Sequence, residues 1–428
     1  MQNLKRMMAA PKVPQPSGER LELLYRLSQA FNSTLDLDEV LNRVMDEVIA
    51  TMHAERGFVM LVDSDGKTTF RAARGLEQKT LEDPQFQVSR SVIEKVLHEG
   101  QPILTSDAMA DERFNMRKSI MAMGLRAILC VPLKNKDAIL GVIYVDNRLR
   151  AGIFQRDDLS LLASIADSAA IAIENARLYR LAIEQGRLER ELQMARKVQS
   201  SLLPHELPQI PGWQFAARWQ PAREVGGDYY DFIPLRNQHL GVLIADVTDK
   251  GMPAALFMAA TRNFVRTSAD GADSPADCIT RVNRLLQTES NDAMYVSMFY
   301  ALLDPATGEL TYVNAGHNPP LYLPAGADRA IELEHTGMWL GVDENSKFEQ
   351  RTITLKPGDL LLLYTDGVTD AINAANEEFG LERAKEVVYR QRAASPEAIS
   401  EALIQSLAAF TAGSAPFDDI TLVLIKRQ

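Results

Sequence analysis

The sequence predicts an α+β protein in which a helical segment joins two globular blocks. Its 428 residues are 46% hydrophobic and 24% charged, which suits two or three domains with sizeable cores. Helical and strand periodicities alternate in both blocks, and a heptad pattern lies between them. We therefore divide the chain into a flexible tail (1–18), a first block (19–176), a linker (177–204) and a second block (205–428).

The composition excludes several classes of protein. A net charge of −11 argues against a nucleic-acid partner, since such proteins carry a basic face. The only cysteines, Cys130 and Cys278, fit a reducing compartment. Apolar runs such as Leu360–Tyr364 are too short to span a membrane, and Met1–Gly18 lacks the apolar core of a secretory signal. We expect a cytoplasmic protein without membrane contact.

The first block combines helices with short strands. Apolar residues recur at helical spacing from Glu19 to Ile49, and Asp36 or Asp38 is a plausible N-cap within this stretch. An Asp-Gly turn at Asp65 separates two β-rich runs and predicts a hairpin. The expected elements are strands at 57–62, 68–73, 127–133 and 138–145 and helices at 91–98 and 154–179.

The linker carries a heptad pattern. One set of positions, spaced by seven residues, is Leu181, Leu188, Ala195 and Leu202, and the interleaved set is Leu178, Gln185, Leu192 and Gln199. This pattern predicts a coiled coil and therefore a homodimer. Gly186 and the glutamines leave open a single amphipathic helix lying along a domain.

The second block alternates apolar strands with helices. The strands are expected at 241–245, 299–303, 310–313, 360–364 and 420–425, and the helices at 253–267, 275–287, 381–393 and 396–410.

Aspartates lie at the ends of these strands. They are Asp228, Asp246, Asp366, Asp418 and Asp419. A single aspartate at such a position is usually a turn residue or a helix N-cap. Four that converge would repel one another and take up protons unless a cation compensated them. Carboxylate oxygens suit Mg²⁺ or Mn²⁺, and the six histidines show no spacing typical of a zinc site.

Residues from about 195 to 428 resemble the SpoIIE-like branch of the metal-dependent protein serine/threonine phosphatases, the PPM family. The resemblance rests on six segments in the family's order: 195–204, 225–232, 246–251, 314–320, 364–370 and 418–422. It implies an αββα sandwich with two Mn²⁺ or Mg²⁺ ions between its sheets.

The resemblance also implies the site residues. Asp228, Asp246 and the carbonyl of Val247 would bind metal from the first half of the block, and Asp366 and Asp419 from the second. Asp246 and Asp366 would be the central catalytic positions. Metal-bound water would then attack phosphorus without a covalent intermediate.

Three further positions in these motifs remain open. Asp418 either supports Asp419 or exchanges with it, and Asp249 stands where many members have glycine. His317 is a candidate general acid, although a loop histidine that shapes the turn is the better explanation.

Residues from about 20 to 175 resemble a GAF domain. The segments that carry this resemblance are 55–58, 71–75, 127–133, 141–146 and 154–162. They indicate the fold and say little about a ligand.

Together the resemblances imply a GAF-regulated phosphatase in bacterial signalling. Its substrate would be a phosphorylated regulator of the anti-anti-sigma (STAS) type, and coupling would act on the loop of Asp228 or on the helices after Asp246. One alternative is a diguanylate cyclase, since Gly226-Gly227-Asp228 resembles the core motif of those enzymes. Another is a non-catalytic adapter built on a phosphatase-like block.

Overall fold

The computed structural model describes residues 25–27, 36–63, 65–75, 88–108, 111, 124–136, 138–289, 294–412 and 417–428. The predicted tail and most of the first predicted helix lie outside these residues. The chain forms two compact units, and the division between them falls within one long helix, after Gly186.

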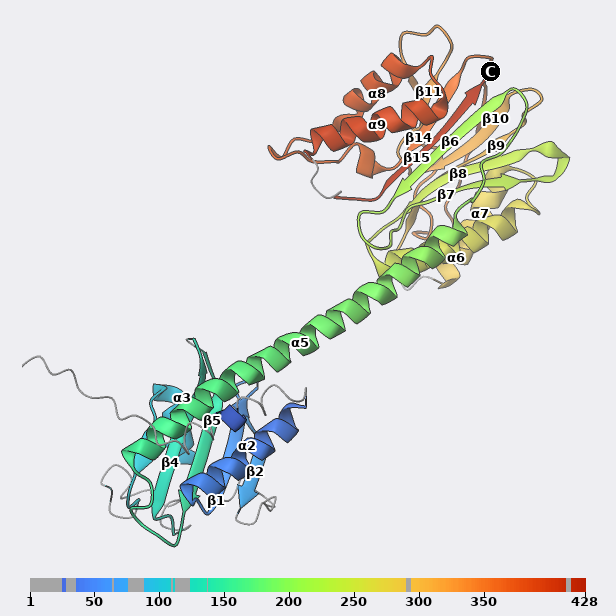
Figure 1. Cartoon of the computed structure of the whole chain (residues 1–428). Coiled ribbons are helices and arrows are strands. Elements are labelled where there is room, and N and C mark those ends of the chain that lie inside the picture. The colour runs from blue at the N-terminus through green and yellow to red at the C-terminus, as the bar shows by residue number, and fades with distance from the viewer. Residues whose placement is uncertain are drawn as a thin grey trace, which may run out of the picture. The chain divides into compact units, whose positions relative to one another are not determined.

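The first unit is built on a five-stranded antiparallel sheet with the strand order β2-β1-β5-β4-β3 (Figure 1). Its strands are β1 (Arg56–Val62), β2 (Thr68–Gly75), β3 (Ile103–Thr105), β4 (Ala127–Asn135) and β5 (Ala138–Asn147). Its helices are α2 (Leu37–Met52), α3 (Arg90–Glu99) and the first part of α5 (Arg156–Leu202).

Alternating side chains of β4 build a core on each face of this sheet. Ala127 and Leu129 pack with α2 and α5, whereas Ile128 and Cys130 pack with α3. Strands buried on both faces read as continuous apolar runs, which is why this one was predictable from sequence. Cys130 is a buried core residue, as expected, and burial raises the pKa of its thiol.

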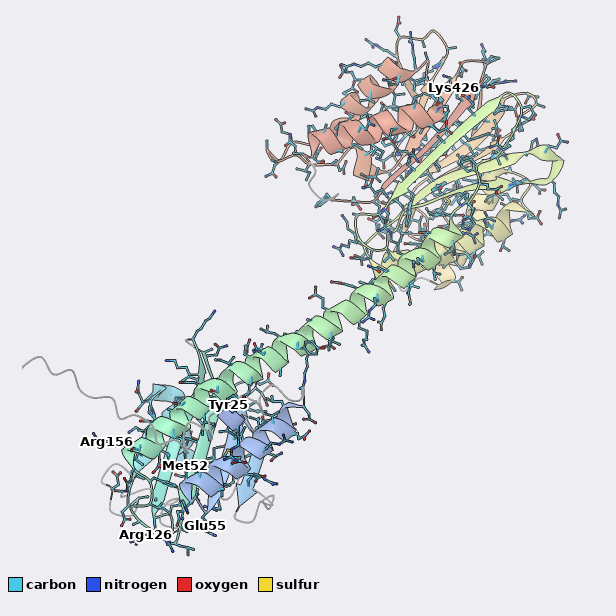
Figure 2. All side chains as sticks on the ribbon, in the orientation of Figure 1. Tyr25, Met52, Glu55, Arg126, Arg156 and Lys426 are labelled. Atoms are coloured by element: carbon cyan, nitrogen blue, oxygen red, sulfur yellow. The ribbon has the colours of Figure 1, made fainter. Side chains whose placement is uncertain are left out.

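Polar contacts fix the ends of several elements in the first unit. Asp36 is the N-cap of α2, because its carboxylate accepts hydrogen bonds from the backbone N–H groups of Asp38 and Glu39. Arg56 and Asp146, opposite each other in β1 and β5, form a buried ion pair of 2.7 Å. Figure 2 labels Glu55 and Arg126 at the same end of the sheet.

Helix α5 is continuous over 47 residues, so the predicted terminal helix of the first block and the predicted linker form one element. Among the described helices it alone is long and apolar enough to cross a membrane by length and composition. One such helix is weak evidence for a membrane span. Leu162, Ile165 and Ala169 of α5 are fully buried in the core shared with α2, which is typical of a helix in a globular domain.

The second unit contains two five-stranded sheets. One has the order β13-β10-β9-β8-β7 and the other β12-β11-β14-β15-β6, and neighbouring strands in both run antiparallel. The strands are β6 (Trp213–Gln220), β7 (Tyr229–Pro234), β8 (Leu240–Val247), β9 (Val296–Leu303), β10 (Glu309–Ala315), β11 (Leu321–Leu323), β12 (Ile331–Glu332), β13 (Arg351–Thr354), β14 (Leu360–Tyr364) and β15 (Ile420–Arg427).

A pair of helices covers the outer face of each sheet (Figure 1). Helices α6 (Met252–Ala269) and α7 (Pro275–Glu289) pack on the first sheet, and α8 (Gly380–Gln391) and α9 (Pro396–Phe410) on the second. In β14, Leu361 and Leu363 face the core between the sheets, while Leu360 and Leu362 face α8 and α9. The predicted αββα sandwich is confirmed.

Sequence patterns missed the short or half-exposed strands. Strands β3, β11, β12 and β13 have two to four residues each, too few for a period of two to emerge. In β6, buried and partly exposed residues do not alternate strictly.

Candidate active site

The predicted aspartates lie at one end of the sandwich, contributed by both sheets. Asp228 directly precedes β7 and Asp246 is the second-last residue of β8, in the first sheet. Asp366 follows β14 after one residue, and Asp419 directly precedes β15, in the second sheet. Hydrogen bonds between these segments show that the two sheet ends meet here.

Asp228 is held rigidly by two threonines of the opposite sheet. Its Oδ2 accepts hydrogen bonds from Thr365 Oγ1 at 2.8 Å and from Thr421 Oγ1 at 2.5 Å. The residue is 1% exposed. Burial, followed by the charges of Asp246 and Asp419, raises its pKa well above the ordinary value, although the threonine hydroxyls oppose the shift.

Asp419 is fixed by backbone donors. Its Oδ1 accepts from Ala222 N at 2.7 Å and its Oδ2 accepts from Gly227 N at 2.7 Å. A Cβ atom on Gly226 would lie 2.0 Å from Asp419 Oδ2, and one on Gly367 would lie 2.0 Å from the Asp419 carbonyl oxygen. These two glycines are therefore required for the carboxylate to approach the backbone so closely.

Asp246 is the electrostatic centre of the cluster. Burial raises its pKa to about 8, and the charges of Asp366, Asp418 and Asp419 add to the shift. Burial raises the pKa of Asp366 to about 6, with the charge of Asp418 next in importance. These carboxylates have few donors to offset their repulsion, so both would be stabilised as anions by a nearby cation.

The donor set fits a hard divalent cation. Five carboxylates lie within mutual electrostatic reach, and all the ligand atoms on offer are oxygens, which Mg²⁺ and Mn²⁺ prefer. Within the described residues, no three Asp, Glu, His or Cys side chains already converge as a metal cage. The carboxylates therefore lie near one another without forming a closed metal cage in this structure.

The Val247 carbonyl, the predicted main-chain ligand, lies beside the loop of Asp228. A Cβ atom on Gly227 would come within 2.8 Å of this oxygen. Gly227 thus keeps open the space next to the carbonyl, where a side chain would block access.

Asp418 and Asp249 have distinct local roles. Asp418 pairs with Lys250 Nζ at 2.7 Å, while Asp419 is tied to the Asp228 loop, so the two neighbours are not equivalent. Asp249 has a left-handed backbone with φ of 77°, and its Oδ1 accepts from Lys250 N at 2.8 Å. Aspartate tolerates this conformation better than most residues do, which explains how it can replace glycine here.

His317 is fully buried rather than exposed to the site. Its Nδ1 lies 2.7 Å from Ser297 Oγ, and burial lowers its pKa to about 3. The imidazole is therefore neutral at physiological pH and is not a source of protons for a leaving group.

The C-terminal end of α5 contacts the Asp228 loop directly. Gln199 Nε2 donates to the Gly226 carbonyl at 2.6 Å, and Gly226 N donates back to Gln199 Oε1 at 3.2 Å. Gln199 is 4% exposed. In addition, Arg262 Nε of α6 donates to the Leu202 carbonyl at 2.6 Å, at the last residue of α5. The end of α5 is thus hydrogen-bonded to the loop that leads into Asp228.

The first unit has a cavity of about 290 Å³ between its sheet and α3. Two charged side chains, Arg90 and Glu94, line it together with mostly apolar residues. The other lining residues are Met60, Thr68, Phe70, Val88, Ile93 and Leu97.

Sequence reasoning found the aspartates but missed their supports. Thr365 and Thr421 flank the recognised aspartates and could have been noticed as hydroxyls at strand ends. Gln199 stood out only as a polar break in the heptad pattern, and nothing local marked Ser297.

Comparisons with known proteins agree with this geometry. The family model of the GAF domain matches residues 36–173, and that of Stage II sporulation protein E (SpoIIE) matches residues 236–428. The second match begins after Asp228, whose place in the site rests on its contacts.

Several known proteins are similar to part of this chain. Protein IcfG of Synechocystis is 35% identical over 266 residues, which are 56% of this chain and 42% of IcfG. Phosphoserine phosphatase RsbU of Bacillus subtilis is 28% identical over 246 residues, 57% of this chain and 72% of RsbU. The SiaA-PP2C domain of Pseudomonas aeruginosa superposes with a TM-score of 0.52 at 20% identity, covering 58% of this chain and 99% of that domain, which shows a shared fold.

We predict that Gly226→Ala weakens Mn²⁺ binding by at least about tenfold, because the added methyl group displaces the Asp419 carboxylate. The measurement is isothermal titration calorimetry on the full chain. The control is Gly186→Ala in α5, where an added Cβ meets nothing within 4 Å and binding should be unchanged. Equal affinities for the two variants would contradict the geometry.

We also predict that Mn²⁺ binding releases protons. Since the folded pKa values of Asp246 and Asp366 exceed the ordinary 3.8, the metal-free fold gains stability from their protonation below about pH 4 and loses it as the pH rises through 6 and 8. Displacing one proton from Asp246 should raise Mn²⁺ affinity about tenfold per pH unit between pH 6 and 8. Calorimetry in buffers of different ionisation enthalpy measures this; a pH-independent affinity without proton release would refute it.

Proposed function

We propose that this chain, which joins a GAF domain to a SpoIIE-type domain of the metal-dependent PPM phosphatases, is a regulated protein serine/threonine phosphatase. The alignment covers less than half of IcfG, so the activity of the whole protein is our inference. The observation that carries it is the ring of buried strand-end aspartates centred on Asp246, on the fold shared with a PP2C domain.

The family is metal-dependent, and we propose two Mn²⁺ or Mg²⁺ ions held by Asp228, Asp246, the Val247 carbonyl, Asp366 and Asp419. Such ions supply hydroxide from bound water and neutralise the phosphoryl group. The chain's own contribution is orientation. Thr365 and Thr421 fix the carboxylate of Asp228, and backbone N–H groups fix Asp419, so neither needs to reorganise.

The substrate we propose is a phosphoserine or phosphothreonine in a small regulatory protein of the STAS type. RsbU is named a phosphoserine phosphatase, which supports the residue class. The site lies at one end of the sandwich, where Asp246 and Asp366 are partly exposed, and this suits a phosphorylated segment of another protein. We place the protein in the cytoplasm, since both cysteines are free and buried.

The diguanylate cyclase alternative has no support in this arrangement. Gly226 and Gly227 allow close packing against Asp419 and the Val247 carbonyl. A cyclase would account for Asp228 but would leave Asp366 and Asp419 without a role. The non-catalytic adapter remains as the outcome of a failed activity test.

The GAF domain and α5 would carry regulation. A small ligand with an apolar body and a charged group would suit the cavity beside Arg90 and Glu94. We propose that α5 transmits the state of the domain through Gln199 to the loop of Asp228.

We predict hydrolysis of p-nitrophenyl phosphate and of a phosphoserine peptide by the full chain with Mn²⁺. EDTA should abolish turnover, and Asp246→Asn or Asp366→Asn should lower it at least about 1000-fold by removing charge that holds the ions. The exposed Asp304, far from the site in sequence and pairing with Thr307, offers a matched Asp→Asn control. Metal-dependent turnover that survives in both site variants would exclude this site.

We predict that Gln199→Leu lowers kcat about tenfold, because two hydrogen bonds worth about 1 kcal/mol each no longer fix the Gly226 backbone. Steady-state kinetics on the phosphopeptide measures the change. Ser200→Ala is the control, since the Ser200 hydroxyl bonds only the Arg196 carbonyl within α5. Wild-type kinetics in Gln199→Leu would remove the proposed route of coupling.

We propose a homodimer through the heptad positions of α5. Leu178, Leu181 and Leu188 are each more than half exposed in the single chain, whereas Gln199 is used by the Gly226 loop. Leu188→Glu should therefore convert a dimer into a monomer at low micromolar concentration, measured by light scattering, while Arg190→Glu on the opposite side of the helix should not. A monomeric wild type would contradict this assembly.

A further inference from the structure

His317 is a buried polar group that the proposed chemistry does not use. It lies in the loop that follows β10 and is 0% exposed. The loop is held from both sides, because His317 N donates to Asn314 Oδ1 at 2.9 Å and His335 Nε2 lies 2.9 Å from the His317 carbonyl oxygen. The backbone of His317 is thereby fixed, and its ring has a defined direction.

On one side the ring reaches the strand next to Asp246. Its Nδ1 lies 2.7 Å from Ser297 Oγ. Ser297 in β9 is the register partner of Asp246 in β8. Directly opposed residues of an antiparallel pair share one face of the sheet, with Cβ atoms about 4.5–5.5 Å apart. The Ser297 hydroxyl therefore stands beside the carboxylate at the centre of the site.

On its other side the ring meets the second sheet. The backbone of Tyr364, the last residue of β14, acts on the imidazole as a hydrogen-bonding group that favours its proton. Tyr364 is followed by Thr365, which bonds Asp228, and then by Asp366. Nε2 itself has no hydrogen-bond partner, so the ring packs against this strand end without a hydrogen bond to it.

The His317 ring stays neutral, so its hydrogen bond with Ser297 does not change across the physiological pH range. Burial keeps the pKa of His317 at about 3, so the ring has one N–H donor and one acceptor throughout the physiological range. In either tautomer Nδ1 forms a hydrogen bond with the Ser297 hydroxyl, so the contact fixes the Ser297 side chain beside Asp246.

We propose that His317 is a positioning residue that spaces the ends of β9 and β14 and orients Ser297 beside Asp246, so that the two halves of the metal centre stay in register. This inference rests on the proposed metal-dependent function. Groups that orient metal ligands from behind typically change metal affinity or activity 10- to 100-fold when removed.

The test measures Mn²⁺ affinity of the full chain by calorimetry, together with kcat, KM and thermal unfolding. His317→Phe and Ser297→Ala should each weaken Mn²⁺ binding about tenfold and lower kcat with little change in KM. The double variant should be no weaker than His317→Phe, since both remove one link. His317→Asn, which retains an amide near the Nδ1 position, should recover part of the affinity.

The control is His205→Asn, which replaces an exposed histidine of the second unit outside the candidate site and should leave Mn²⁺ affinity unchanged. Wild-type affinity in both His317→Phe and Ser297→Ala would overturn the inference, as would a rate loss accompanied by a lost limb of the pH profile, which marks a proton donor. If His317→Phe does not fold, Ser297→Ala decides. Failure of the wild type to bind Mn²⁺ would instead refute the metal-dependent function.

Discussion

The second unit depends on the electrostatic cost of bringing aspartates from two sheets to one buried end of a sandwich. Burial and mutual repulsion raise the pKa of Asp246 to about 8, and no lysine or arginine neutralises it directly. Such a cluster opposes folding unless protons or cations compensate it. The fold tolerates the cluster because large apolar cores stabilise each sheet elsewhere. A bound divalent cation would relieve the repulsion between the carboxylates, and this relief would add to its affinity.

In the proposed metal centre, two carboxylates are held in place by hydrogen-bond donors and two are less restrained. Asp228 and Asp419 are held by hydroxyl and backbone donors from the opposite sheet, so they also join the two halves of the sandwich. Asp246 and Asp366 have the less compensated charge. Gln199 of α5 also binds the loop of Asp228, so the proposed metal binding and the proposed regulation meet at one short loop.

Sequence patterns predicted the strands that carry aspartates, because β8, β14 and β15 are continuous apolar runs that end in a charge. They also predicted the helices closely, as the spacing of apolar residues is local information. They could not predict the contact of Thr421 with Asp228, which spans 193 residues, or that of Gln199 with Gly226. Such contacts depend on how the sheets face each other, which periodicity does not encode. The heptad pattern led us to predict a separate linker, whereas α5 is one continuous helix that begins in the first unit.

The most direct test of the account is to locate Mn²⁺ by anomalous scattering in crystals of the full chain. We expect two peaks flanking the Asp246 carboxylate, one on the side of Asp228 and the Val247 carbonyl and the other on the side of Asp366. Crystals that bind no Mn²⁺ at this end of the sandwich, or that bind it away from Asp246, would contradict the claim that these carboxylates form a dinuclear centre.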